Sequence, residues 1–242
     1  MPEIIRINGS PDVCARRFKG LLGEIGGISG FEVYAQPPNK YEGITNYRLD
    51  EGDVVQIPSS YGLILKCDEG DQEVWIEGVA CGYSGSGASC TAEVLQMLGV
   101  RMNYRRINEE ENILMNEVRS EHKLNFIVRK CDPLSEEEEI VLKTQLEFET
   151  PHDRISAFDY IELFGELTSI ESSSQYSHRE EYYFRESYSA VEGKSKYGTN
   201  QILTLGYDFV AFDAQSLEVI FKNIAERFNA KSTKIIIYNL NK

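Results

Sequence analysis

Hydrophobic and polar positions follow two periods along the chain, and these periods separate helix-forming from strand-forming segments. Apolar residues at helical spacing predict helices near 11–25, 89–98, 151–167 and 214–229. Two of these begin with a proline directly after Ser10 or Thr150, where the missing N–H costs nothing and the hydroxyl side chain can cap the helix. The helices are spaced along the whole chain, so strands are expected between them.

The N-terminal part beyond the first helix has the pattern of successive strands. After an opening strand at 3–7, the region from Phe31 to Ile76 contains five strand-like runs: FEVYA, GITNYRL, VVQIP, YGLILKC and EVWIEG. Proline, asparagine, aspartate and glycine mark the turns between them. Short turns between strands predict an antiparallel meander.

The C-terminal part predicts strands at 123–129 and about 140–149, and it closes with a strand, a helix and a strand over 202–238. The segment 101–121 is ambiguous, with Asn108 as a helix cap and a following helix as one interpretation. The pattern as a whole predicts an α/β or α+β fold with a mixed sheet, an N-terminal antiparallel meander and a C-terminal strand-helix-strand unit. We expect one compact domain over 1–242, with two lobes, 1–102 and 103–242, as the alternative.

Composition limits the classes of partner that the protein can bind and indicates its cellular compartment. The formal net charge is −14 over 242 residues, and it is spread along the chain, which disfavours general nucleic-acid binding because phosphate backbones are bound by cations. No apolar run reaches the roughly 18 residues of a membrane span, so no membrane partner is expected. The N-terminus lacks a secretory pattern, and the five cysteines have no paired spacing. These features predict a cytoplasmic protein with free thiols.

The sharpest local feature is a strand, a glycine-rich turn and a helix start within Val74–Gly99. This order of elements can bind an anion on backbone N–H groups at the helix N-terminus. The candidate ligand-binding residues are Gly82, Ser84, Gly85, Ser86, Gly87 and Ser89. The run from Gly85 to Cys90 matches the dinucleotide-binding pattern GxGxxG except that Cys90 replaces the third glycine. A preceding meander and an unclear acidic partner, Glu109, favour a tight structural turn instead.

Other candidate groups have simpler structural interpretations. His152 could act as a general base, but it lies in a helix start that capping already explains, and His178 fits a solvated loop. Cys90 in a first helical turn would have a lowered pKa and could act as a nucleophile, although packing is the alternative. The glutamates at 136–139 fit a solvated turn. No His or Cys cluster has metal-ligand spacing, so no metal is predicted and the cofactor is unknown.

The segment 168–200 is rich in tyrosine, serine, arginine and glutamate and has no sustained period. Tyrosine and arginine are enriched at interface hot spots, which makes Tyr182, Tyr183, Arg185 and Tyr188 candidate partner-binding residues. The leading hypothesis is a non-catalytic binding or regulatory protein that engages a protein partner or itself as a homo-oligomer. The alternative is a nucleotide- or phosphoester-handling enzyme that uses the loop 82–90.

Overall fold

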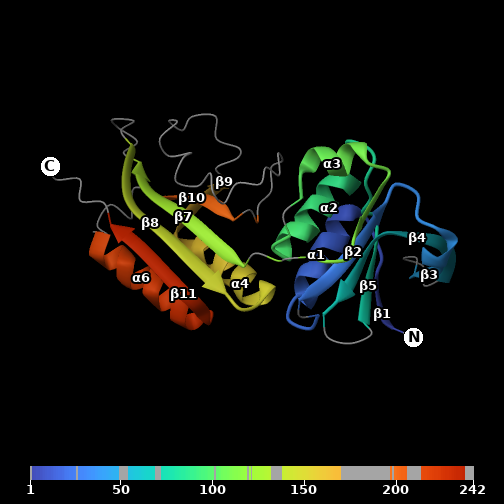
Figure 1. Cartoon of the computed structure of the whole chain (residues 1–242), viewed down its shortest axis with the longest axis horizontal. Coiled ribbons are helices and arrows are strands. Elements are labelled where there is room, and N and C mark those ends of the chain that lie inside the picture. Colours follow the sequence, from blue (N-terminus) through green and yellow to red (C-terminus); the bar gives the residue numbers. More distant parts are fainter. Residues whose placement is uncertain are drawn as a thin grey trace. The chain divides into compact units, whose positions relative to one another are not determined.

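The computed structural model describes residues 2–25, 27–48, 54–68, 72–100, 102–118, 120, 122–131, 138–169, 197, 199–205 and 214–237. Contacts divide the chain into two compact units, Met1–Ser120 and Glu121–Lys242, so α3 and β6 belong to the first unit. Figure 1 shows both units. Five α-helices and eleven strands lie in this described part, and the mixed α+β fold expected from the sequence is confirmed.

The first unit is a mixed sheet with helices on one side (Figure 1). Its elements are β1 (Glu3–Ile7), α1 (Pro11–Leu21), β2 (Ile28–Tyr34), the short 3-10 helix η1 (Asn39–Tyr41), β3 (Glu42–Arg48), β4 (Val54–Cys67), β5 (Gln72–Glu77), α2 (Ser86–Met97), α3 (Tyr104–Glu109) and β6 (Asn112–Met115). The strand order is β1-β5-β4-β2-β6, and β3 pairs with β4 outside this path. The pairs of β4 are antiparallel, as the predicted meander requires, whereas β1 pairs with β5 in parallel.

The first sheet buries apolar side chains on both of its faces. Successive side chains on a strand point to opposite faces, so each strand contributes to both. One layer contains fully buried side chains such as Phe31, Leu63 and Val74, on the side where α1 packs against β1 and β5. The alternate positions form an aromatic cluster on the other face, made of Tyr34, Tyr41, Tyr61, Ile64 and Trp75. The sheet therefore has a core on each of its faces.

The second unit is a five-stranded sheet of order β11-β8-β7-β10-β9. Its elements are β7 (Lys123–Cys131), β8 (Glu138–Phe148), α4 (Pro151–Ile161), η2 (Glu162–Phe164), β9 (Gly165–Ser169), β10 (Asn200–Leu205), α6 (Ala214–Arg227) and β11 (Ala230–Ile237). β7 and β10 are parallel, and the other neighbours are antiparallel. Phe126 of β7 contacts Phe221 of α6, with ring centroids 5.9 Å apart, so α6 covers the apolar face. The predicted strand-helix-strand close is confirmed as β10, α6 and β11.

Most predicted helices are confirmed, and their ends are informative. Thr150 caps α4 as expected, since its hydroxyl accepts a bond from the Asp153 N–H at 3.1 Å. The helix predicted to 167 instead ends at Ile161, and β9 occupies 165–169, pairing with β10. The helix proposed after Asn108 is wrong. Asn103 caps α3 instead, and β6 extends the sheet beside β2, where strand pairing overrides local helical periodicity.

Within the described residues, no helix is long and apolar enough to cross a membrane.

Candidate functional site

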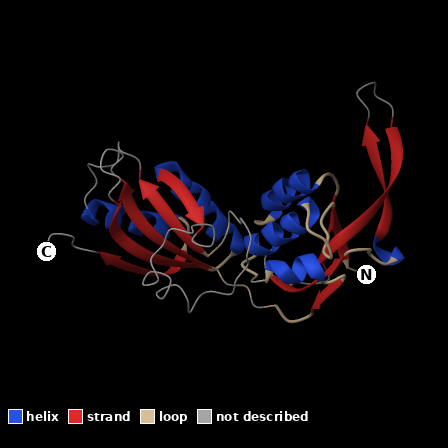
Figure 2. Ribbon diagram, turned by 90° about the horizontal axis from the view of Figure 1, so that it is seen from above, coloured by secondary structure: helices blue, strands red, loops and turns tan. Residues whose placement is uncertain are grey.

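The clearest exposed feature of the first unit is a two-stranded ribbon, which we call the arm. It consists of β3 and Val54–Ser60 of β4, paired antiparallel from Glu42 opposite Ser60 to Arg48 opposite Val54. Figure 2 shows this ribbon extending away from the rest of its sheet. β4 then continues as Tyr61–Cys67 into the core, between β2 and β5. The arm is thus the overhanging half of a strand whose other half is central.

The arm exposes large apolar side chains on both of its faces. Ile44 and Val54 are 68% and 61% exposed, and Val55 and Ile57 are 39% and 43% exposed. The register puts Ile44 and Val54 on one face, and alternation puts the other two on the opposite face. These four are half of the large hydrophobic side chains that are exposed in the described residues. Such a concentration is typical of a contact surface, whereas single exposed hydrophobics are ordinary.

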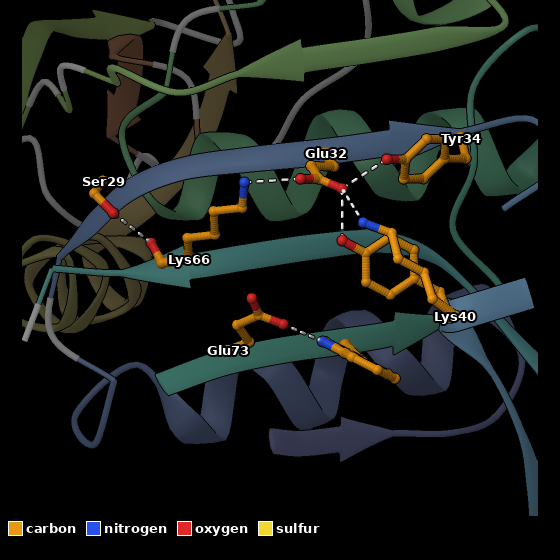
Figure 3. A network of polar contacts seen from close by, with 8 residues as sticks. Ser29, Glu32, Tyr34, Lys40, Lys66 and Glu73 are labelled. Carbon is orange, nitrogen blue, oxygen red and sulfur yellow. Dashed lines mark hydrogen bonds and ion pairs between the residues drawn. The ribbon is translucent and has the colours of Figure 1, made fainter. Parts of the chain in front are cut away.

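The arm begins at a polar hub centred on Glu32 of β2 (Figure 3). The Glu32 carboxylate accepts hydrogen bonds of 2.6 Å from the hydroxyls of Tyr34 and Tyr41, and it forms a 2.7 Å ion pair with Lys66. Lys40 approaches the same carboxylate at 3.8 Å. Lys40 and Tyr41 belong to η1, the turn of helix that directly precedes β3. The hub therefore ties the start of the arm to the sheet.

Aromatic packing and electrostatics strengthen this attachment. The Tyr41 ring meets the Trp75 ring edge-on, with centroids 5.0 Å apart, and is almost fully buried. Burial opposes the charge on Glu32, but the bonds from Lys66, Tyr34 and Tyr41 together outweigh it and lower the pKa to about 2. Burial and the neighbouring carboxylate raise the pKa of both tyrosines. Glu32 is consequently ionised, with its oxygen atoms held by the hub.

The predicted glycine turn between β5 and α2 is present, and neighbouring groups contact much of its backbone. Gly82 has φ of +80°, which favours glycine, and its N–H donates to the Ile107 carbonyl at 2.8 Å. A Cβ on Gly85 would lie 2.6 Å from the Tyr83 ring, and one on Gly87 would collide with the Tyr83 hydroxyl. The tyrosine ring therefore lies against this turn. Ser84, Ser86 and Ser89 are exposed, and Ser89 bonds to Tyr104 at 2.7 Å.

Two observations bear on the nucleotide interpretation of this turn. The expected meander argued against a parallel strand pair, yet β5 does have a parallel neighbour in β1. The candidate acidic partner, Glu109, forms an exposed ion pair with Arg105 at 2.8 Å. Anion binding by the turn stays a prediction, with the parallel pair in its favour and the engaged Glu109 against a bound ribose.

The cysteines adjoining the turn are buried thiols. Cys14, Cys67, Cys81 and Cys90 are free and buried. The Cys90 thiol donates to the Pro11 carbonyl at 3.1 Å, and burial raises its pKa to about 12, with a further contribution from Glu93. The expectation of a lowered pKa is therefore wrong, because desolvation outweighs the position in the first helical turn. This thiol packs two segments together rather than presenting a nucleophile.

The remaining candidates are dispersed. His152 is exposed in the first turn of α4, next to the Thr150 cap, whereas His178 lies outside the described residues. Tyr182, Tyr183, Arg185 and Tyr188 also lie outside them, so their proposed contact with a partner stays a prediction. Within the described part of the chain, no three His, Cys, Asp or Glu side chains gather as a metal site.

Sequence reasoning missed the arm, although a signal for it was present. VVQIP and YGLILKC were predicted as two strands, but they form one strand of 14 residues. That is well beyond the usual length of about 5–6 residues. Its first half contains Pro58, and a proline within a sheet is confined to edge strands, strand starts and bulges. Pro58 was therefore the signal that this half lies outside the centre of the sheet.

No family model matches the chain, and no curated protein or solved structure is significantly similar to it.

Proposed function

We propose that the protein is a non-catalytic binding or regulatory protein that holds a protein partner on its arm. The observation that carries this proposal is the exposure of Ile44, Val54, Val55 and Ile57 on both faces of one ribbon. A two-stranded hairpin is only marginally stable in water, and exposed apolar area is a cost that a partner removes. The hub at Glu32 supports this role because it fixes the start of the arm on the sheet.

A protein partner fits the arm better than a nucleic acid or a charged small molecule. The arm contains two charged residues, Glu42 and Arg48, and these have opposite signs. Nucleic acids are held mainly by clustered cations, which this ribbon lacks. Apolar β-branched side chains instead gain affinity by being removed from water against another protein surface.

The proposal is tested by comparing a variant in the arm with a matched variant elsewhere. Ile57→Lys adds a charge to the arm, whereas Val219→Lys adds the same charge at an exposed β-branched position on α6. Purified wild type and both variants are cross-linked in lysate of the producing cells, and the captured proteins are quantified. We expect Ile57→Lys to lose specific captures, including captured copies of this chain, that Val219→Lys retains. Equal captures by all three proteins would contradict the proposal.

The segment 168–200 is proposed as a second binding segment, for a protein partner or for another copy of the chain, through Tyr182, Tyr183, Arg185 and Tyr188. Its support is compositional, since these residue types predominate in interface hot spots. Replacing Tyr182, Tyr183 and Arg185 by alanine should abolish association with a partner or with another copy while the fold stays intact. Unchanged association would remove the segment from the proposal.

A cytoplasmic location belongs to the same proposal. It is supported by the four free, buried thiols in the described residues, which suit a reducing compartment.

The second candidate function is a nucleotide- or phosphoester-handling enzyme that uses the turn before α2. The parallel β1–β5 pair favours it, because phosphate sites commonly lie where a helix begins at the end of a parallel strand. Nucleotides should then raise the melting temperature. Gly85→Val should remove that rise; the atoms nearest to an added Cβ at this position belong to the Tyr83 side chain, which can move. No shift with any common nucleotide would contradict this function.

A further inference from the structure

We infer that His122 is a pH-sensitive contact within the second unit. As a neutral imidazole it holds the end of β8 and the beginning of α4 to the beginning of β7, and protonation in mild acid releases them. This contact is independent of the arm, because every residue involved belongs to the second unit. The hydrogen bonds of the ring and the charges around it together make the contact depend on pH.

His122 directly precedes β7 and joins it to the end of β8. Its carbonyl oxygen accepts a hydrogen bond of 2.9 Å from the Phe148 N–H. Its Nδ1 lies 2.9 Å from the carbonyl oxygen of Glu149, the residue that precedes the Thr150 cap of α4. One residue therefore connects three elements, through its backbone to β8 and through its ring to the start of α4.

The bond to Glu149 determines which ring nitrogen carries the proton. A carbonyl oxygen only accepts hydrogen bonds, so Nδ1 of His122 must carry a proton, and Nε2 has the lone pair of the neutral imidazole. Nε2 is shielded from solvent and has no hydrogen-bond partner among the described residues. A second proton would create a charged ring with a buried N–H that no acceptor satisfies, which costs free energy.

The charges that face the ring add to this cost. Close to it the described residues supply charges from four places: Lys123 on β7, Glu147 and Glu149 at the end of β8, Arg154 on α4 and Lys231 on β11. Arg154 is fully buried, so water does not screen its guanidinium, whereas Glu149 is exposed and its charge is screened. Lys231 shares its charge with Glu147 at 3.5 Å. Burial, with Arg154 and Lys231, outweighs the contribution of Glu149 and lowers the pKa of His122 below its ordinary value of 6.5.

The lowered pKa determines the direction of the pH effect. An opened or unfolded chain binds a proton at His122 as pH falls through 6.5, whereas the folded unit resists protonation. The stabilisation is therefore complete above pH 6.5 and is lost progressively as pH falls below it. Opening at the ends of β7 and β8 exposes the ring at a lower cost than unfolding of the whole unit. Mild acid thus loosens the end of β8 and the beginning of α4 first.

Hydrogen exchange followed by mass spectrometry tests this contact on the full chain. Peptides covering 144–156 report on the end of β8 and the beginning of α4. After correction for the intrinsic rates, we expect their protection in wild type to fall by up to about tenfold between about pH 7.5 and pH 5.5. His122→Gln cannot titrate and should remove this pH dependence. His152→Gln is the matched control, since it removes an exposed histidine in the first turn of α4 and should keep the wild-type behaviour.

Equal pH dependence in wild type and His122→Gln would overturn the inference. A second measurement uses wild type alone, so it does not depend on the folding of a variant. The assigned imidazole protons of the histidines are followed by NMR as pH is lowered, and His122 should titrate at a lower pH than His152. A His122 ring that titrates together with His152 would equally overturn the inference.

Discussion

The two halves of β4 place similar residues in opposite environments. In the second half, Leu63, Ile64 and Leu65 are fully buried between β2 and β5, whereas in the first half Val54, Val55 and Ile57 are exposed beside β3 alone. Both halves are extended, although the pairing register shifts between Tyr61 and Leu63, where the halves meet. Their exposure differs because β2, β5 and the apolar core cover the second half, whereas β3 is the strand that pairs with the first half among the described residues. An apolar strand residue adds to stability only where another layer removes it from water.

The largest expected effect is in the core half. Leu63→Ala removes a fully buried side chain and leaves a cavity, so it should lower the free energy of unfolding by about 3 kcal/mol. Denaturant unfolding followed by fluorescence measures this change in the first unit, because the chain has a single tryptophan and Trp75 lies there. An effect below about 1 kcal/mol would show that the core half is not well packed.

A substitution at Gly62, where the two halves of β4 meet, should lower the free energy of unfolding almost as much. A Cβ on Gly62 would collide with the Val79 carbonyl oxygen, and the register shifts between Tyr61 and Leu63. Gly62→Ala should therefore cost about 2 kcal/mol, since backbone must move to admit the methyl group. Gly20→Ala is the matched control, because no atom lies within 4 Å of its added Cβ. Equal stability of the two variants would remove the steric argument.

The hub at the start of the arm should have a smaller effect that depends on pH. Glu32→Gln loses the ion pair with Lys66 but still accepts bonds from Tyr34 and Tyr41, so the expected loss at neutral pH is about 1.5 kcal/mol. The folded-state pKa of Glu32 is lowered from 4.5 to about 2, so its stabilisation is present above pH 4.5 and is lost as pH falls toward 2. The difference in unfolding free energy between wild type and Glu32→Gln should therefore shrink across that range. A difference that stays constant would show that Glu32 ionisation does not stabilise the hub.

The smallest effect on stability is expected in the arm itself. Ile57→Thr should change the free energy of unfolding of the monomer by less than about 0.5 kcal/mol, because the side chain is 43% exposed. The same change should weaken association. The core half of β4 would then determine stability, and the arm half would determine binding. Unfolding of the purified chain at low protein concentration makes this measurement. A loss as large as that of Leu63→Ala would mean that the arm belongs to the core.

The sequence by itself determined most of the local structure. The stripe of Cys14 and Phe18 correctly predicted α1, and Thr150 with Pro151 correctly predicted the start of α4. These features are local, since helical periodicity and capping depend on residues within one or two turns. A period-two pattern likewise predicted β8, and the apolar run at 123–129 predicted β7.

Only the tertiary structure decided which strands are neighbours and where the candidate site lies. Periodicity tells which face of a strand is buried but not what covers it, so the parallel β1–β5 pair and the overhang of β4 could not be derived from the pattern. The hub joins Glu32 of β2 to Lys66 of β4, which is distant along the chain. Burial also reversed the pKa expected for Cys90. Each of these features is set by contacts distant in sequence, and such contacts exist only once the sheet has formed.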